Sequence, residues 1–321
     1  MTATRTDDID DIDDHVARID LRAWREGGAR ERERVAAELD GALRAHGFCL
    51  ITGHGVPQEQ RAELRSLART FFLLPEQVKA GYAARPGGSG WSPPLPVAPG
   101  RPPDLKETFS FRAGGSTGSA TLDRGRTELW PREVPRLEAA AGEFLRHMRA
   151  LSDELLSVCA VALGASPGHF RAFRRDPTHA GALKWYPSLR RLGAPGPGQQ
   201  RVGPHTDLGA LTVIDREFGL GGLQLETADG RWIDAPYEPD ALSVTVGELL
   251  ARWTGDRWPA CRHRVAPPPP DAPEEDLLSL LYVSGADHDA LVEPFPPPVG
   301  ITAYPPVLWG DYLRANLTAQ R

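Results

Sequence analysis

The residues from Gly203 to Val265 are divided into short apolar segments by glycine, proline and polar turn residues. Each segment is only a few residues long and carries the branched and aromatic side chains that favour β-strands. The segments lie at 203–214, 221–225, 230–233 and 242–248. Short strands separated by frequent turns are typical of all-β barrels and sandwiches, so we expect this part of the chain to form such a core.

A histidine and an aspartate stand at the start of this region, in the order His205-Thr206-Asp207. On a strand, residues i and i+2 point to the same face with Cα atoms roughly 6.6 Å apart, so both side chains can bind one ion. His263 follows 56 residues after Asp207 (263 − 207), far enough for several short strands to bring it back beside the pair. Two histidines and one carboxylate are the ligands of non-haem Fe(II) oxygenases, which keep positions open for O2 and an organic ligand.

The His-x-Asp pair is a weak signal when it is taken alone. It occurs by chance in many chains of this length, and a histidine on a strand is more often a hydrogen-bonded structural group than a ligand. Turn residues before the pair and a β-rich run after it place the pair at the head of a buried strand. This context favours an iron site made by His205, Asp207 and His263.

The first half of the chain carries helical patterns. Apolar residues recur at helical spacing in segments 30–46, 58–74 and 134–165. Segments 48–52 and 104–111 are expected strands between these helices. Residues 86–103 are crowded with glycine and proline, and a loop of this length commonly forms a lid or a pocket wall.

We expect one domain over residues 1–321, because strand-like sequence resumes after the proline run at 267–270. Its expected parts are a mainly helical N-terminal region over 1–175 packed on the β core, the β core with the iron site over 180–295, and a C-terminal tail or helix over 296–321.

Composition excludes several classes of partner. The net charge of −6 provides no basic field that would attract nucleic acid or an anionic membrane. No window approaches the roughly 18–20 consecutive apolar residues of a membrane span, and the aspartate-rich start lacks the basic and apolar regions of a secretory signal. The three cysteines are far apart and predict neither a disulfide framework nor a zinc site. We therefore expect a cytoplasmic monomer that acts on a small-molecule substrate.

Many separate segments resemble, in order and spacing, the isopenicillin N synthase-like family of Fe(II)- and 2-oxoglutarate-dependent dioxygenases. The resemblance covers nearly the whole chain. Its motifs are Gly47-Phe48, Gly53-His54-Gly55-Val56, Asp104-Leu105-Lys106-Glu107, Trp185-Tyr186-Pro187, His205-Thr206-Asp207, Gly221-Gly222-Leu223-Gln224, Arg252-Trp253-Thr254, His263-Arg264-Val265 and the run around Ser279. The resemblance implies a mainly β fold with flanking helices, in which a double-stranded β-helix (a cupin-like jelly roll) holds iron near one open end and the N-terminal helices pack outside.

The family also implies 2-oxoglutarate as a cosubstrate. Its keto-acid end chelates iron, and its far carboxylate meets an Arg-x-Ser pair on a late strand and a tyrosine on an earlier one. Tyr186 and Ser279 match the tyrosine and the serine, but Leu277 stands where the arginine belongs. A buried carboxylate that lacks its partner would cost on the order of 3–5 kcal/mol, so ordinary binding of the cosubstrate is in doubt.

Two interpretations accommodate the missing arginine. Lys184 precedes Tyr186 by two residues and shares its strand face, at a position where relatives often have asparagine, so its ammonium could meet the carboxylate as a point charge. The structural alternative is that Lys184 extends to solvent at a strand end. The second interpretation dispenses with 2-oxoglutarate, and the substrate then supplies all the electrons, as in isopenicillin N synthase-like oxidases.

The sequence thus predicts an Fe(II)- and O2-dependent oxygenase that uses 2-oxoglutarate to oxidise an aliphatic C–H of a small molecule by hydroxylation, desaturation or cyclisation. The alternatives are a 2-oxoglutarate-independent Fe(II) oxidase or cyclase and a non-catalytic binding protein on the same fold. Abundant arginine and the proline-rich loop suggest specialised metabolism, such as antibiotic biosynthesis, in a high-GC organism.

Overall fold

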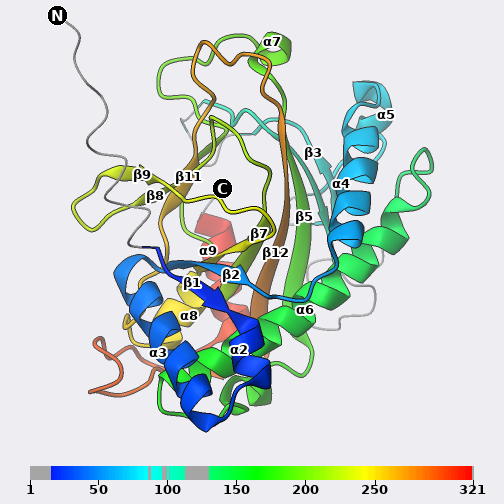
Figure 1. Ribbon diagram of the computed structural model, residues 1–321. Coiled ribbons are helices and arrows are strands. Elements are labelled where there is room, and N and C mark those ends of the chain that lie inside the picture. Colours follow the sequence, from blue (N-terminus) through cyan, green and yellow to red (C-terminus); the bar gives the residue numbers. More distant parts are fainter. Residues whose placement is uncertain (1–15, 86–87, 96–99, 101, 113–129, 320–321) are drawn as a thin grey trace, which may run out of the picture.

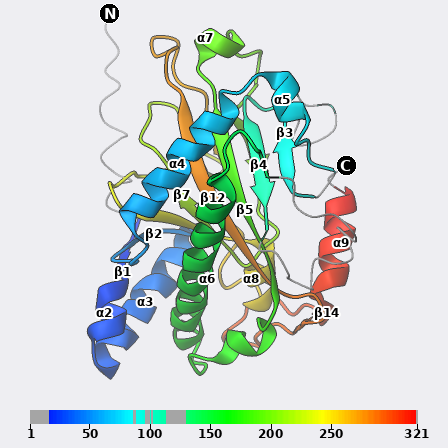
Figure 2. The ribbon, with the colours of Figure 1, turned by 90° about the vertical axis from the view of Figure 1, so that its right-hand side faces the viewer.

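A computed structural model describes residues 16–85, 88–95, 100, 102–112 and 130–319 of the chain. Within these residues the molecule is built on two facing sheets with helices on the outer side of the larger one (Figures 1 and 2). The larger sheet has the strand order β1-β2-β10-β7-β12-β5-β4-β3 among the described residues. Its strands are β1 (Arg18–Asp20), β2 (Phe48–Thr52), β10 (Leu242–Val246), β7 (Leu211–Asp215), β12 (Leu277–Asp287), β5 (Pro177–Tyr186), β4 (Glu107–Phe111) and β3 (Gly90–Ser92).

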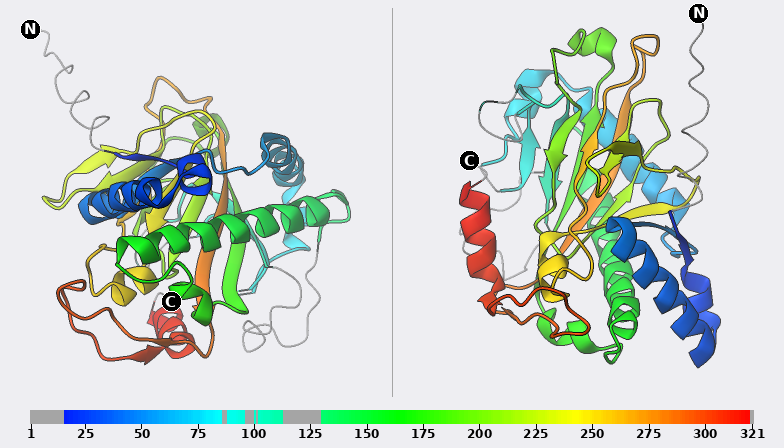
Figure 3. Two further views of the ribbon diagram at one scale, coloured as in Figure 1. Left: turned by 60° about the horizontal axis from the view of Figure 1, so that its bottom comes forward. Right: turned by 90° about the vertical axis from the view of Figure 1, so that its left-hand side faces the viewer.

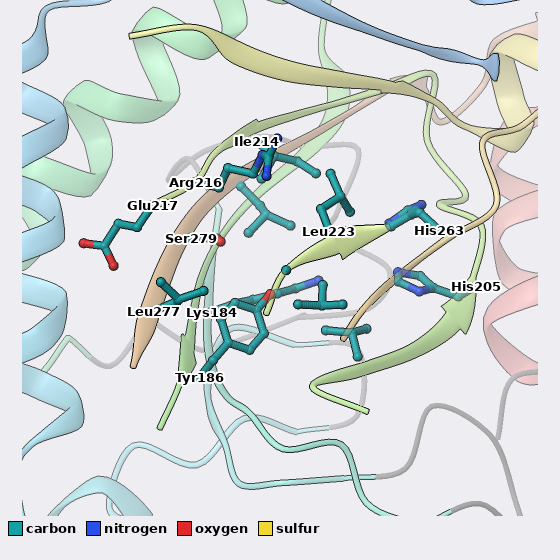
Figure 4. Close-up of a pocket in the computed structure, with 14 residues that line it drawn as sticks. Lys184, Tyr186, His205, Ile214, Arg216, Glu217, Leu223, His263, Leu277 and Ser279 are labelled. Carbon is teal, nitrogen blue, oxygen red and sulfur yellow. The ribbon is translucent and has the colours of Figure 1, made fainter. Parts of the chain in front are cut away.

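The smaller sheet carries strands from the second half of the chain in the order β6-β11-β8-β9. Its strands are β6 (Val202–His205), β11 (His263–Val265), β8 (Leu223–Glu226) and β9 (Trp232–Asp234). Two mainly antiparallel sheets with their inner faces opposed form the predicted jelly roll, so the predicted fold class is confirmed. The space between the two sheets is where the candidate site lies (Figure 4).

The long helices lie against the outer face of the larger sheet (Figures 2 and 3). The helices within the described residues are α2 (Leu21–Glu26), α3 (Ala29–His46), α4 (Gln58–Phe72), α5 (Glu76–Ala80), α6 (Leu137–Ala162), α7 (Leu189–Leu192), α8 (Glu248–Trp253) and α9 (Trp309–Ala319), with a 3₁₀ turn at His169–Phe173. Helix α6 contacts α3 and α4, and its buried face includes Phe144, Met148, Leu151 and Leu155. Apolar residues three or four apart place one stripe of α3, α4 and α6 against the larger sheet, as their spacing predicted.

Gly47 ends α3 and allows the chain to enter the sheet at once. Its φ of 61° lies in the left-handed region, and its backbone N–H donates to Leu43 O at 2.9 Å. A Cβ at this position would lie 2.4 Å from Pro259 O. A glycine is therefore required both by the backbone conformation and by the close approach of the neighbouring chain.

The N-terminal part of the chain contributes more than helices. Strands β1 to β4 extend both edges of the larger sheet, and β2 pairs with β10 so that Cys49 lies opposite Val244. The expected strand at 104–111 is β4, and β3 lies within the glycine- and proline-rich segment. The aspartate-rich start of the chain lies outside the described residues. Among the described helices, none is long and apolar enough to cross a membrane.

Candidate active site

The three residues of the predicted iron site meet between the two sheets. Strand β11 pairs antiparallel with β6, so that the Cα atoms of His263 and His205 are partners and the two rings lie 4.3 Å apart between centroids. The expectation that Asp207 shares a strand with His205 is wrong, because β6 ends at His205 and Asp207 lies between β6 and β7, beside both rings. Its Oδ1 is 3.7 Å from His205 Nε2, and its Oδ2 is 3.9 Å from His263 Nε2. One ligand atom from each residue lies within 4.8 Å of the others, which suits a single bound ion.

Backbone carbonyls fix both imidazoles in the form that binds metals. Nδ1 of His205 lies 2.9 Å from Gly203 O, and Nδ1 of His263 lies 3.0 Å from Cys261 O. Because a carbonyl oxygen only accepts hydrogen bonds, each Nδ1 carries the proton and each Nε2 keeps a free lone pair toward Asp207. Burial lowers the pKa of His205 well below its usual range, so the ring stays neutral at pH 7.

Two hydroxyl groups hold the carboxylate of Asp207. Thr212 Oγ1, on β7, donates to Asp207 Oδ2 at 2.6 Å, and Thr245 Oγ1, on β10, lies 3.5 Å from the same oxygen. The aspartate is therefore oriented from the larger sheet while the histidines come from the smaller one. Two imidazoles that present Nε2 and one oriented carboxylate form a donor set that fits Fe(II).

A cavity extends from the histidines along the inner face of the larger sheet (Figure 4). Its lining consists of Lys184, Tyr186, Val202, His205, Ile214, Arg216, Glu217, Gly222, Leu223, His263, Val265, Leu277, Ser279 and Leu281. Seven of these residues carry polar or charged side chains, and the other seven are apolar or glycine. The carboxylate of Glu217 points away from the cavity (Figure 4) and pairs with Arg69 at 2.6 Å. The wall that these residues form therefore presents cationic and hydroxyl groups to a ligand.

The predicted cosubstrate residues share this cavity. Strands β5 and β12 pair so that Lys184 lies opposite Ser279 and Tyr186 lies opposite Leu277. All four residues line the cavity, which puts them on the same inner face of the sheet. Leu277 presents an apolar side chain at the position where the family carries arginine, as the sequence indicated. Lys184 lies within the strand and faces inward (Figure 4), so the expectation that it extends to solvent is wrong.

The ammonium of Lys184 lies in the cavity between the two sheets. Burial, followed by repulsion from Lys106, lowers the pKa of Lys184 to about 8. The nearby Asp207 acts in the opposite sense, which places the ammonium at the iron end of the cavity. Burial also raises the pKa of Tyr186, so its hydroxyl stays protonated and can donate a hydrogen bond.

Sequence reasoning missed Arg216, which lines the same cavity. The available signal was strand alternation: Arg216 follows Ile214 by two residues and so continues the inward face of β7. Whether Arg216 meets the cosubstrate residues depends on which strands lie beside β7, and the order of the strands in the sequence does not determine this.

The fold and these ligands define a non-haem iron oxygenase, and comparison with known proteins identifies its family. Residues 16–133 match the N-terminal region of the non-haem dioxygenase in morphine synthesis, and residues 186–273 match the 2OG-Fe(II) oxygenase superfamily. Validamycin A dioxygenase of Streptomyces hygroscopicus subsp. limoneus is 36% identical over 291 residues, which cover 88% of this chain and 80% of the relative. A homoarginine-6-hydroxylase of Glycine max is 27% identical over 270 residues, 81% of this chain and 80% of that protein.

Solved structures share the fold. A full-length protein of Neurospora crassa, solved in complex with alpha-KG, superposes with a TM-score of 0.83 at 24% identity, covering 94% of this chain and 96% of that one. A dioxygenase for auxin oxidation in rice gives a TM-score of 0.71 at 24% identity, covering 95% of each chain. The chain belongs to the 2OG-Fe(II) oxygenase superfamily, and it is an Fe(II)- and 2-oxoglutarate-dependent dioxygenase.

Proposed function

We propose that this enzyme oxidises an aliphatic C–H bond of a small molecule in specialised metabolism, with hydroxylation, desaturation or cyclisation as the outcome. The observation that carries the proposal is the cavity that joins the three candidate iron ligands to inward-facing cationic and hydroxyl side chains. The similarity to Validamycin A dioxygenase supports a small-molecule substrate, as does the absence of a basic field for nucleic acid.

His205, Asp207 and His263 hold Fe(II) in this proposal. When bound, iron supplies the activation of O2, with two electrons provided by oxidative decarboxylation of 2-oxoglutarate. The protein has three tasks at this centre. Nδ1 hydrogen bonds orient both imidazoles with Nε2 toward Asp207, Thr212 holds the carboxylate of Asp207, and the apolar part of the cavity wall limits the access of water.

Lys184, Tyr186 and Ser279 hold the cosubstrate. Lys184 supplies positive charge at low dielectric, where its attraction to an anion is much stronger than in water. Tyr186 is protonated, and Ser279, which lies diagonally across from it on β12, shares a side-chain hydrogen bond with it, so the two hydroxyls form one polar pair on the cavity wall. A cavity of this charge fits a dianion and therefore supports 2-oxoglutarate use over the oxidase or cyclase alternative.

The direct test is an anaerobic titration of Fe(II)-loaded protein with 2-oxoglutarate, observed through the visible charge-transfer band of the keto-acid chelate. We expect a saturable band that needs iron. Asp207→Ala should abolish iron binding and with it the band, and Lys184→Met should weaken 2-oxoglutarate binding while iron binding persists. Iron binding without a band would favour the oxidase or cyclase alternative, and failure of Fe(II) to stabilise the protein would favour a non-catalytic binding protein.

A further inference from the structure

Ser279 lies between two cationic side chains on neighbouring strands. On one side, β5 places Lys184 directly opposite Ser279. On the other side, β7 pairs with β12 so that Ile214 lies opposite Leu281 and Asp215 opposite Leu280. One further step in the same register brings Arg216 beside Ser279. Three adjacent strands therefore point one lysine, one serine and one arginine into the same cavity.

The guanidinium of Arg216 is held by the protein but is not neutralised by it. Its Nε donates to Ser243 Oγ at 3.1 Å, and its Nη2 donates to Ala235 O at 2.9 Å and to Pro236 O. Within the described part of the chain, no carboxylate pairs with Arg216 and no acceptor meets its Nη1. The guanidinium is therefore fixed in position on the cavity wall, and its Nη1 N–H groups remain available to donate hydrogen bonds to a carboxylate ligand.

Arg216 and Lys184 serve different ends of the cavity. The charge of Lys184 acts on Asp207 and His205, so its ammonium lies near the iron ligands. The guanidinium carbon of Arg216 lies 5.4 Å from the ring centroid of Tyr237. Burial lowers the pKa of Arg216 to about 10, Tyr237 and Asp234 act in the opposite sense, and no iron ligand contributes. Figure 4 agrees: the Lys184 amine is directed toward His205 and His263, while Arg216 extends from β7 beside Ile214.

We propose that Arg216 replaces the arginine missing at position 277 and binds the far carboxylate of 2-oxoglutarate, together with Tyr186 and Ser279. Lys184 then acts at the keto-acid end. In this proposal the arginine lies at the end of β7 instead of on the adjacent strand β12. Leu277 then occupies the family's arginine position with an apolar side chain. This inference rests on the proposed use of 2-oxoglutarate and assigns the residue that makes the enzyme specific for it.

The test compares 2-oxoglutarate with 2-oxobutyrate, which has the same keto-acid end but no far carboxylate. Both are titrated anaerobically into Fe(II)-loaded protein, and the ratio of their dissociation constants is measured from the charge-transfer band. We expect Arg216→Gln to weaken 2-oxoglutarate binding by about a hundredfold and to leave 2-oxobutyrate binding nearly unchanged, because only the former loses a carboxylate partner. Arg231→Gln, which changes an exposed arginine outside the cavity, is the matched control and should keep the wild-type ratio.

A rescue variant separates binding from folding. Leu277→Arg combined with Arg216→Gln returns the guanidinium to the family position opposite Tyr186, and we expect it to restore most of the preference for 2-oxoglutarate. If Arg216→Gln does not fold, Arg216→Lys is tested in its place. This variant keeps the positive charge but loses the planar bidentate donor, so we expect the affinity for 2-oxoglutarate to fall about tenfold and that for 2-oxobutyrate to stay unchanged.

Several outcomes would overturn the assignment. It fails if folded Arg216→Gln, or Arg216→Lys in its place, keeps the wild-type ratio of the two ligands. It also fails if Lys184→Met abolishes the preference for 2-oxoglutarate over 2-oxobutyrate, because Lys184 would then bind the far carboxylate. A wild-type protein that binds iron but shows no band with either ligand would instead refute the proposed function itself, and the Arg216 assignment with it.

Discussion

Thr206 Oγ1 donates a hydrogen bond to Glu248 Oε1 at 2.7 Å. Thr206 stands between the two candidate ligands His205 and Asp207, and Glu248 begins helix α8. The other carboxylate oxygen of Glu248 accepts from Tyr312 Oη of α9 at 2.8 Å. A single glutamate thus connects the C-terminal helix to the segment that carries two of the three ligands.

Removal of the Tyr312 hydroxyl should loosen this connection. We expect Tyr312→Phe to speed amide hydrogen exchange in α9 roughly tenfold or more, because a hydrogen bond to a charged group contributes about 1.5–3 kcal/mol. Exchange measured by mass spectrometry on peptides from 309–316 gives the readout. Tyr304→Phe, which removes a hydroxyl that donates to Asp256 at 2.6 Å, is the control and should leave α9 unchanged. Equal exchange rates in the wild type and in Tyr312→Phe would show that the hydrogen bond from Tyr312 to Glu248 does not stabilise α9.

The hydroxyl of Thr212 orients the iron-binding carboxylate. Thr212→Val keeps the shape of the side chain but removes the donor to Asp207 Oδ2, so we expect iron affinity to fall by about 10- to 100-fold. Competition with a chelator of known affinity measures the change. Thr70→Val makes the same chemical change on α4, where Thr70 Oγ1 donates to Ser66 O, and should leave iron affinity unaltered. Unchanged affinity in Thr212→Val would mean that packing alone holds the carboxylate.

Binding of 2-oxoglutarate should depend on pH through Lys184. The charged ammonium is the form that attracts a dianion, and burial lowers its pKa to about 8 in the free protein. Affinity should therefore be level below about pH 8 and fall by up to tenfold per pH unit above it, since the bound dianion raises the pKa again. Calorimetric titration of Mn(II)-loaded protein from pH 7 to pH 9.5 measures this. In Lys184→Met the decline should vanish, and a decline of the same steepness in the variant would assign it to another group.

A second buried cation stabilises the fold. Lys79 is 1% exposed and its Nζ pairs with Glu107, which also accepts from Trp91 Nε1 at 2.7 Å. Lys79→Met leaves a buried carboxylate without its cation, so we expect the free energy of unfolding to fall by about 3–5 kcal/mol in urea denaturation.

Two variants control for the loss of a lysine as such. The double variant Lys79→Met with Glu107→Leu removes both charges and should recover much of the lost stability. Arg34→Met removes a cation from an exposed pair with Glu38 and should leave the unfolding free energy nearly unchanged. A cost for Lys79→Met as small as that for Arg34→Met would show that water enters this part of the core.

The iron ligands were identified from the sequence, but the predicted reason holds only in part. His205 and Asp207 lie close together because they are two residues apart, whereas strand alternation does not place them, since β6 ends at His205 and Asp207 lies between β6 and β7. His263 was proposed from its spacing of 56 residues, which several short strands can fill, and the resemblance to a family supported it. The pairing of β11 with β6 brings it opposite His205. Helix α3 and its end at Gly47 were also evident from the sequence, since spacing and capping are local properties.

Other features depended on which strands become neighbours. The sequence showed that Leu277 replaces an arginine and that Lys184 shares a strand face with Tyr186, and both statements concern one strand at a time. Register between strands is determined by hydrophobic contacts and turns far apart in the chain, so no local pattern could place Arg216 beside Ser279. Alternation within a strand determines which side chains point inward, whereas the packing of the whole sheet determines which of these side chains come into contact.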